Sequence, residues 1–571
     1  MKKLALSFIM ISLIPVFAQQ AEPPILDYDS RFQPVVGQKG MVSSQDELAT
    51  NIGLEILKQG GNAVDAAVAV GFALAVTLPK AGNLGGGGFM MVYLAEENKS
   101  IALDFRETAP AKASRDMYLN ADGNVDNQKA RFSYLSAGIP GTPAGLSHAV
   151  TKYGTMPLKK LMEPALALAR DGFIVGEGLN HDLSYFSKRL GQNPSTRKAY
   201  FNEEGKAPAK GSRLVLKDLA WSLSQIAEHG PDAFYKGELG QKFSAAVLEG
   251  GGLITMEDLA AYKVVEGEPV RGTYRGYEVV SMPPPSSGGV HIIQMLNILE
   301  GWPIGEYGAN SAQTLHLMTE AMRVAYADRS KYLGDPAFSK VPVAGLISKD
   351  YAASLRAGIA LNKARKSKDV HPGQVPGYES PDTTHFSTVD GKGNMVAVTY
   401  TLNFSFGSGL VAEGTGILLN NEMDDFSAKP GTPNAYGLLG GEANAIGPGK
   451  RPLSSMTPTF LFKDGKPFLV TGSPGGSRII TTVLQIILNV VDHDFNIALA
   501  SNMPRMHHQW YPDAVSLEQG ISKDTIRLLE SWGQTVKPAE TMGSTQSIMI
   551  KGGYLYGAAD PRRPGALAKG F

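Results

Sequence analysis

Thr383 stands at a junction where this chain could cut itself. A loop rich in proline, glycine and charge, residues 366–381, gives way there to an alternating, strand-like run, residues 383–390. A threonine hydroxyl at a strand start can attack the preceding carbonyl, that of Asp382, and water then opens the resulting ester. The new terminus would carry a hydroxyl nucleophile and, in its own α-amine (ordinary pKa about 7.7 to 8.0), a nearby base. The sequence therefore predicts that cleavage between Asp382 and Thr383 creates a catalytic site.

A second hydroxyl is predicted to lie opposite Thr383. Residues 383–389 and 395–401 both alternate like strands, and the segment between them has the Gly, Asn and Asp content of a hairpin turn. A hairpin centred on Lys392 without a bulge pairs Thr383 with Thr401. Opposed Cβ atoms lie about 4.5 to 5.5 Å apart, so Thr401 can orient the Thr383 hydroxyl by a hydrogen bond. The alternative is a threonine pair that merely stabilises the sheet, and both interpretations can hold.

Six ordered motifs resemble the γ-glutamyltranspeptidase family over essentially the whole mature chain. They are DFRETAP at 104–110, TTHFS at 383–387, TYTLN at 399–403, NNEMDDF at 420–426, RPLSSM at 451–456 and GSPGGSR at 472–478. The resemblance implies an N-terminal nucleophile hydrolase with an α+β fold, a four-layer αββα sandwich. It also implies one precursor that cleaves itself into a large subunit, 19–382, and a small subunit, 383–571. The implied reaction transfers the γ-glutamyl group of glutathione and related amides to water, an amino acid or a dipeptide.

A γ-glutamyl group presents a carboxylate, an ammonium and an amide, and the motifs offer a partner for each. Arg106 suits the carboxylate because a guanidinium binds it through two parallel hydrogen bonds. The hydroxyls of Ser454 and Ser455 can add donors to the same group, and the ammonium can be held by Asn403, Glu422 and Asp425. Taken singly, these residues could equally be an exposed ion-pairing arginine, a polar turn and a helix cap. The family motifs favour the functional interpretation.

Gly475 and Gly476 precede a predicted helix and could stabilise the oxyanion of the reaction. Two unhindered backbone N–H groups at a helix amino terminus favour a developing negative charge. A purely structural turn is the competing explanation. Residues 429–441, with Tyr436 inside, resemble the lid loop that covers the glutamyl pocket in many bacterial members of the family.

The composition sets wider limits on function. Lys plus Arg and Asp plus Glu are each 54 among 571 residues, so no global field attracts nucleic acid or an anionic membrane. The chain has no cysteine, and before residue 366 no low-complexity linker divides it, so one large sandwich is expected. His507 and His508 are adjacent and the other histidines are scattered, so neither a metal nor another cofactor is predicted.

The first residues have the pattern of a signal peptide. Residues 1–3 are a short basic start, residues 4–17 are apolar but short for a membrane span, and 16–18 form a small-residue cleavage site. We therefore expect residues 1–18 to be removed on export, to the periplasm or, as the second choice, outside the cell. An uncleaved anchor is the less favoured alternative.

The pattern of apolar residues predicts several helices and strands. Helices are predicted at 46–59, 62–78 and 478–490, and strands at 459–462 and 468–470. The glycine run 85–88 leads into a strand and lacks the lysine and Ser/Thr pair of a phosphate loop, so it predicts tight backbone packing near a pocket.

Two alternatives to a γ-glutamyl transferase stay open at this point. One is a related acylase that removes glutaryl-type side chains from β-lactams and needs no ammonium site. The other is an uncleaved, inactive protein that binds glutamyl compounds.

Overall fold

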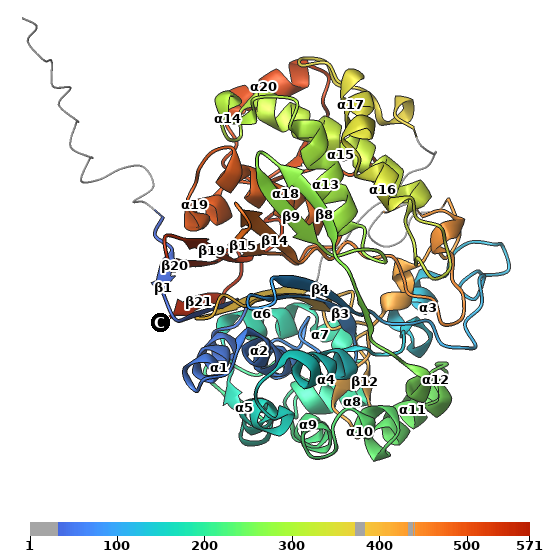
Figure 1. Cartoon of the computed structure of the whole chain (residues 1–571). Coiled ribbons are helices and arrows are strands. Elements are labelled where there is room, and N and C mark those ends of the chain that lie inside the picture. Colours follow the sequence, from blue (N-terminus) through green and yellow to red (C-terminus); the bar gives the residue numbers. More distant parts are fainter. Residues whose placement is uncertain (1–31, 372–382, 432–437, 439) are drawn as a thin grey trace, which may run out of the picture.

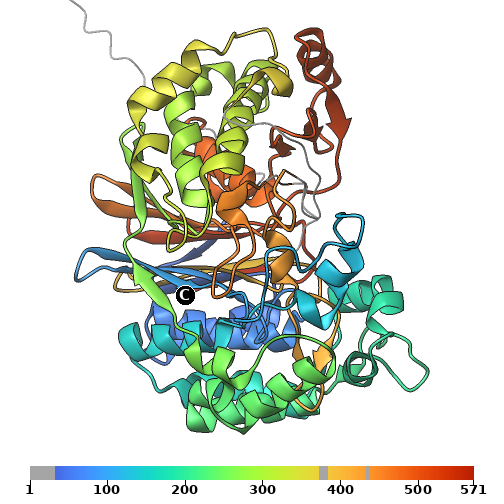
Figure 2. The same ribbon diagram turned by 90° about the vertical axis from the view of Figure 1, so that its right-hand side faces the viewer.

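The computed structural model describes residues 32–371, 383–431, 438 and 440–571. The expected signal peptide, Asp382 and Tyr436 lie outside these described residues. The chain forms a mixed α+β fold in which two seven-stranded sheets lie between groups of helices (Figures 1 and 2). The α+β class expected from the sequence is confirmed.

Both large sheets are antiparallel. The β10 sheet has the order β21 (Leu567–Gly570), β2 (Gly40–Ser44), β10 (Thr384–Asp390), β11 (Met395–Thr401), β3 (Gly87–Leu94), β4 (Lys99–Phe105), β7 (Val265–Gly267). The β15 sheet has the order β1 (Val35–Gly37), β20 (Tyr554–Ala559), β19 (Gln546–Lys551), β15 (Lys466–Thr471), β14 (Thr459–Lys463), β9 (Tyr277–Ser281), β8 (Val270–Tyr274).

Helices cover the outer face of each sheet (Figure 1). Those beside the β10 sheet include α1 (Glu47–Lys58), α2 (Ala63–Thr77), α4 (Thr142–Tyr153), α5 (Leu158–Asp171) and α9 (Lys217–His229). Those beside the β15 sheet include α13 (Gly288–Leu299), α15 (Ala312–Tyr332), α17 (Lys349–Ala357) and α18 (Arg478–Val491). The helices predicted at 46–59, 62–78 and 478–490 correspond to α1, α2 and α18.

The two faces of the β10 sheet belong to two separate hydrophobic cores. Met395 and Ala397 of β11 pack into a core shared with the β15 sheet and α13, α15 and α18. Val396 and Val398 point to the opposite face and pack with α1, α2 and α5. This alternation is the period of two that a strand imposes, and it places β10 and β11 in the middle of the molecule.

The ends of α1 and α2 show why these helices begin where they do. The Asp46 side chain accepts a hydrogen bond from the Ala49 N–H, and Asn62 and Asp65 form a reciprocal capping box. These caps satisfy N–H groups that have no partner inside the helix. Every residue of α2 is buried, as its run of alanine and valine predicts.

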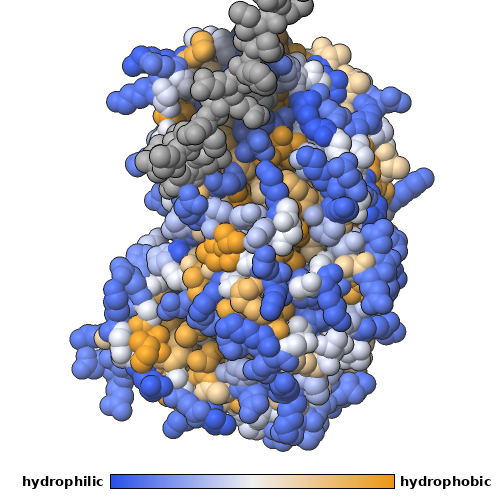
Figure 3. All heavy atoms as spheres, turned by 60° about the vertical axis from the view of Figure 1, so that its left-hand side comes forward, coloured by the Kyte–Doolittle hydropathy of each residue, from blue (hydrophilic) through white to orange (hydrophobic). Residues whose placement is uncertain are grey.

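The surface is mainly polar. The face in Figure 3 is largely hydrophilic, with hydrophobic patches separated by hydrophilic side chains. Single exposed apolar side chains, such as Tyr185 and Phe338, are normal for a globular protein. Among the described residues, no helix combines the length and apolar character needed to cross a bilayer.

Candidate active site

Thr383 and Thr401 are brought together at one end of the β10–β11 hairpin. Thr384 pairs with Tyr400 and Val389 with Met395, which is the register that the turn predicts. Thr383, one residue before β10, lies beside Thr401, with 3.4 Å between the two Oγ1 atoms. Both side chains are buried. The hydroxyl of Thr383 is therefore held next to a second hydroxyl in the interior of the protein.

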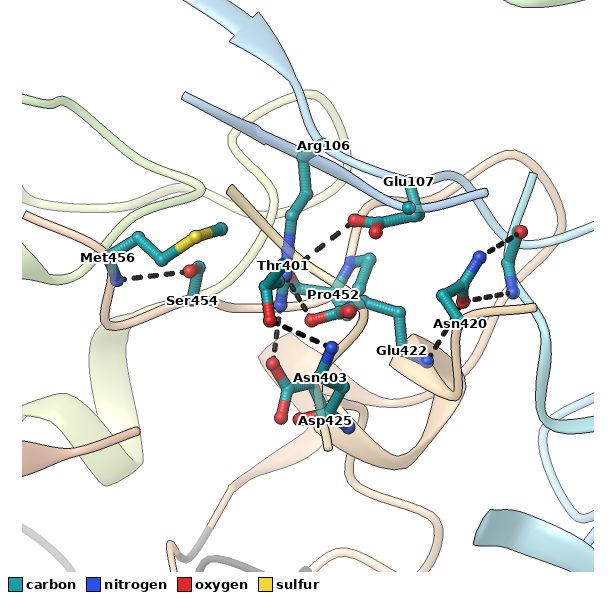
Figure 4. Close-up of polar contacts among 12 residues, drawn as sticks. Arg106, Glu107, Thr401, Asn403, Asn420, Glu422, Asp425, Pro452, Ser454 and Met456 are labelled. Carbon is teal, nitrogen blue, oxygen red and sulfur yellow. Dashed lines mark hydrogen bonds and ion pairs between the residues drawn. The ribbon is translucent and has the colours of Figure 1, made fainter. Parts of the chain in front are cut away.

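Contacts with the glycine run and with Asn403 fix the position of Thr401. Its Oγ1 accepts a hydrogen bond from the Asn403 N–H at 2.8 Å (Figure 4), and its carbonyl accepts one from Asn83 Nδ2 at 2.9 Å. A Cβ atom at position 86 would lie 1.9 Å from the Thr401 carbonyl oxygen, so only glycine fits there. The tight backbone packing predicted for residues 85–88 is confirmed at this contact.

Arg106 lies at the centre of a cluster of acids (Figure 4). Its guanidinium donates to Glu422 and to Asp425, and its Nε donates to the Pro452 carbonyl at 3.3 Å. Glu107 Oε2 lies 3.6 Å from Nη1. The sequence predicted that Arg106 and the acids would serve opposite charges of one ligand. The structure shows them in direct contact, because a buried guanidinium needs counter-charges.

The cluster contains more acid groups than bases. Burial raises the pKa of Glu107 to about 7, and it also raises the pKa values of Glu422 and Asp425. Burial would lower the pKa of Arg106, but the carboxylates around it raise that pKa above its ordinary value. Within the described part of the chain, neither carboxyl oxygen of Glu107 has a hydrogen-bond partner, and neither does Oε2 of Glu422. Because Glu422 also borders the cavity that Thr383 lines, its unpartnered oxygen can accept a hydrogen bond from a cationic donor.

The turn that carries Ser454 and Ser455 is held by residues far away in sequence. The Ser454 N–H donates to the Pro285 carbonyl at 2.9 Å, and the Ser454 carbonyl accepts from the hydroxyl of Ser287 at 2.7 Å. Ser455 Oγ accepts a hydrogen bond from Nη2 of Arg329 at 3.1 Å.

Arg329 was missed from the sequence. It lies in α15, where most residues are buried although several of them are charged. Charged residues are mostly exposed in proteins, so the sequence pattern does not distinguish a buried arginine in this helix from one that faces solvent.

Gly475 and Gly476 precede the amino terminus of α18. Their φ angles are +133° and +57°, a region that favours glycine. Among the described residues, neither N–H group has a protein acceptor. Gly476 borders the same cavity as Thr383, and Gly475 is the residue before it.

These groups surround one small cavity of about 20 Å³. Its walls include Arg106, Arg329, Thr383, Thr401, Asn403, Glu422, Asp425, Ser454, Ser455 and Gly476, and Leu438 of the expected lid segment also borders it. That volume holds little more than one water molecule. A larger cavity of about 620 Å³, lined by Tyr262, Arg451 and several prolines, does not include Thr383.

A metal site would need several ligand side chains around one point. No group of three or more His, Asp or Glu side chains in the described ranges is placed to hold one.

A threonine hydroxyl, a neighbouring hydroxyl and a charged cavity form the kind of site that transfers acyl groups. The sequence pattern of the gamma-glutamyltranspeptidase family matches residues 49–570. The glutathione hydrolase proenzyme of Escherichia coli (strain K12) is 56% identical over 561 residues, 97% of each chain. That of Pseudomonas sp. (strain A14) is 50% identical over 549 residues, 94% of this chain and 95% of that protein. The solved cephalosporin acylase from Bacillus halodurans has a TM-score of 0.84 at 29% identity, covering 96% of this chain and 99% of that one. The chain belongs to the γ-glutamyltranspeptidase family.

Proposed function

We propose that this protein cleaves itself before Thr383 and then hydrolyses glutathione and transfers γ-glutamyl groups through an ester on that residue. The observation that carries the proposal is the position of the Thr383 hydroxyl. It lies beside Thr401 on the wall of a cavity that also contains Arg106, Glu422 and Asp425. The nucleophile, a cation for the substrate's α-carboxylate and anions for its α-ammonium therefore border the same cavity.

Maturation is an acyl shift followed by hydrolysis. Thr383 Oγ1 attacks the carbonyl carbon of residue 382, the C–N bond breaks, and the hydroxyl proton passes to the departing nitrogen. Water then cleaves the ester, which leaves a carboxylate on residue 382 and a free amine on Thr383. The contact with Thr401 supports this role because it orients the attacking oxygen.

Turnover repeats the same chemistry on the substrate. The Thr383 amine takes the hydroxyl proton, Oγ1 attacks the γ-carbonyl carbon, and the N–H groups of Gly475 and Gly476 stabilise the oxyanion. The amide C–N bond breaks and the leaving amine takes up the proton. Water, an amino acid or a dipeptide then attacks the ester and releases Thr383.

The charged cluster recognises the glutamyl head. Glu422 and Asp425, with the side chain of Asn403, accept hydrogen bonds from the ammonium, and Arg106, Ser454 and Ser455 donate to the carboxylate. The unpartnered oxygen of Glu422 supports the ammonium position. Tyr436, which lies outside the described residues, would close the lid over this group.

Fold and location are part of the proposal. Two stacked sheets with helices outside them support classification as the four-layer αββα sandwich of N-terminal nucleophile hydrolases. The pattern of residues 1–18 supports export to the periplasm. Recovery of activity by osmotic shock of the producing cells tests the location, and activity retained in the cytoplasm contradicts it.

Glutaryl-type acylase activity is the second candidate function, because one of the solved structures that this chain resembles is a cephalosporin acylase. The two candidates differ in their need for an ammonium site, so the test compares γ-glutamyl and glutaryl p-nitroanilide with purified protein. We expect Asp425→Asn to lower kcat/KM for the γ-glutamyl compound about tenfold to a hundredfold, the effect of one hydrogen bond to a charged group. The exposed control Asp122→Ala should change neither substrate's turnover.

Other outcomes decide between the candidates. Turnover of the γ-glutamyl anilide that is unchanged in Asp425→Asn, with glutaryl as the better substrate, favours the acylase. A single uncut mass and no turnover of either anilide favours the inactive binding protein.

A further inference from the structure

Arg329 is a second buried guanidinium on the wall of the Thr383 cavity. It lies near the carboxyl end of α15 and is 4% exposed. Its Nε donates to Ser287 Oγ at 2.9 Å and its Nη2 donates to Ser455 Oγ at 3.1 Å. One side chain thus connects α15, the residue at the N-cap position of α13, and the turn that carries Ser454 and Ser455 before β14, here called the serine turn.

These contacts add to the hydrogen bonds that hold the serine turn in place. The N–H and the hydroxyl of Ser287 both donate to the Ser454 carbonyl, at 2.8 and 2.7 Å. Arg329 adds a hydrogen bond to the next residue of the turn, Ser455. Because Ser455 Oγ accepts from Arg329, its own hydroxyl proton is directed away from the guanidinium.

Arg329 also contributes charge to the cavity. Burial raises the pKa of Asp425, and the positive charge of Arg329 is one of the effects that oppose this rise. Arg106 is in contact with Glu422 and Asp425, so much of its charge is already balanced. Arg329 contacts Ser455 through Nη2, so a carboxylate entering beside Ser455 would also experience the charge of Arg329.

We infer that Arg329 is a positioning residue for the substrate's α-carboxylate: it holds Ser455 in place and supplies a second positive charge to that end of the cavity. The inference rests on the proposed function. It assigns the carboxylate to an Arg329–Ser455 pair in addition to Arg106. It follows that the contribution of Arg329 depends on the carboxylate and not on the reacting amide.

Kinetics with Arg329→Gln test this assignment. We expect KM for γ-glutamyl p-nitroanilide to rise about tenfold or more, with kcat within about threefold, because a hydrogen bond to a charged group is lost. Arg329→Lys keeps the charge but not the two-armed geometry and should recover part of the loss. Arg356→Gln, which removes an arginine bonded to the backbone carbonyls of α13, is the matched control and should behave like the wild type.

A substrate without the carboxylate separates positioning from general damage. The 4-aminobutanoyl anilide keeps the ammonium and the amide, so Arg329→Gln should change its kcat/KM less than twofold. Equal losses on both anilides, or a fall in kcat at unchanged KM, would overturn the inference; so would a Lys variant as weak as the Gln variant. If the wild-type protein itself fails to cleave the γ-glutamyl anilide, the proposed function fails instead.

Discussion

Thr401 is the residue on which the position of the Thr383 hydroxyl depends most directly. Its Oγ1 contacts the Thr383 hydroxyl and accepts the Asn403 N–H. Thr401→Val keeps the shape but removes both contacts, so self-cleavage should slow by roughly threefold to tenfold, the effect of one lost hydrogen bond. The buried Asn403 N–H loses its acceptor, which should also lower the free energy of unfolding by about 1 to 3 kcal/mol.

The rate of self-cleavage on a denaturing gel and the unfolding midpoint in urea measure these two effects. Thr401→Ser, which keeps the hydroxyl, is the control and should stay close to the wild type. A Val variant that matures at the normal rate would show that Thr401 serves only the sheet.

Glu107 should make stability depend on pH. Burial raises its pKa from an ordinary 4.5 to about 7, so the folded protein holds this proton more tightly than the unfolded chain. The stability that the protonated Glu107 contributes is fully present below pH 4.5 and is lost as the pH rises through 7. The side chain of a Glu107→Gln variant cannot ionise. When both proteins carry Thr383→Ala and so stay uncut, the free energy of unfolding of this variant should fall less between about pH 5 and pH 8 than that of the protein with Glu107, by up to about 3 kcal/mol. Thermal midpoints at the two pH values measure this difference, and identical pH dependences with and without Glu107 would contradict it.

At the scale of elements, the glycine run at 85–88, which leads into β3, determines where the end of β11 can lie. The Gly86 position leaves no room for a Cβ atom next to the Thr401 carbonyl. Gly86→Ala should therefore displace Thr401 and slow self-cleavage by more than about tenfold, because the nearest atom is backbone and cannot turn aside. Gly267→Ala, at the end of β7, meets no atom within 4 Å and is the control. Normal maturation of the Gly86 variant on a denaturing gel would show that this contact does not position the site.

Local elements could be predicted from the sequence because their signals are local. The turn after Asp390 set the register of the hairpin and so placed Thr401 beside Thr383. Asp46 and Asn62 marked the starts of α1 and α2.

Contacts between distant segments could not be predicted in this way. The contact of Arg106 with Glu422 and Asp425 joins residues more than three hundred positions apart, and no local pattern encodes it. For the same reason, the sequence does not reveal Arg329, whose place in the site depends on the packing of α15 against the serine turn.

At the scale of the whole molecule, each large sheet combines strands from both sides of the expected cut. In the β10 sheet, β10 and β11 lie between β2 and β3, which precede the cut. In the β15 sheet, β14 pairs with β9 across the same boundary. Breaking one peptide bond therefore removes none of the inter-strand hydrogen bonds that join the two fragments.

The cleaved fragments should accordingly behave as one particle. We expect them to co-elute in gel filtration and to separate only in denaturant, because both hydrophobic cores contain residues of both fragments. Intact Thr383→Ala protein provides the reference elution volume. Separation of the fragments in native buffer would contradict the interleaved arrangement.

The most direct test of the central claim is the amino-terminal sequence of the small fragment in active, purified protein. A nucleophile that supplies its own base must be the first residue of its chain, so the fragment should begin with Thr383 and continue through His385. A fragment that begins at another residue, or full activity in a chain that remains uncut, would contradict the account.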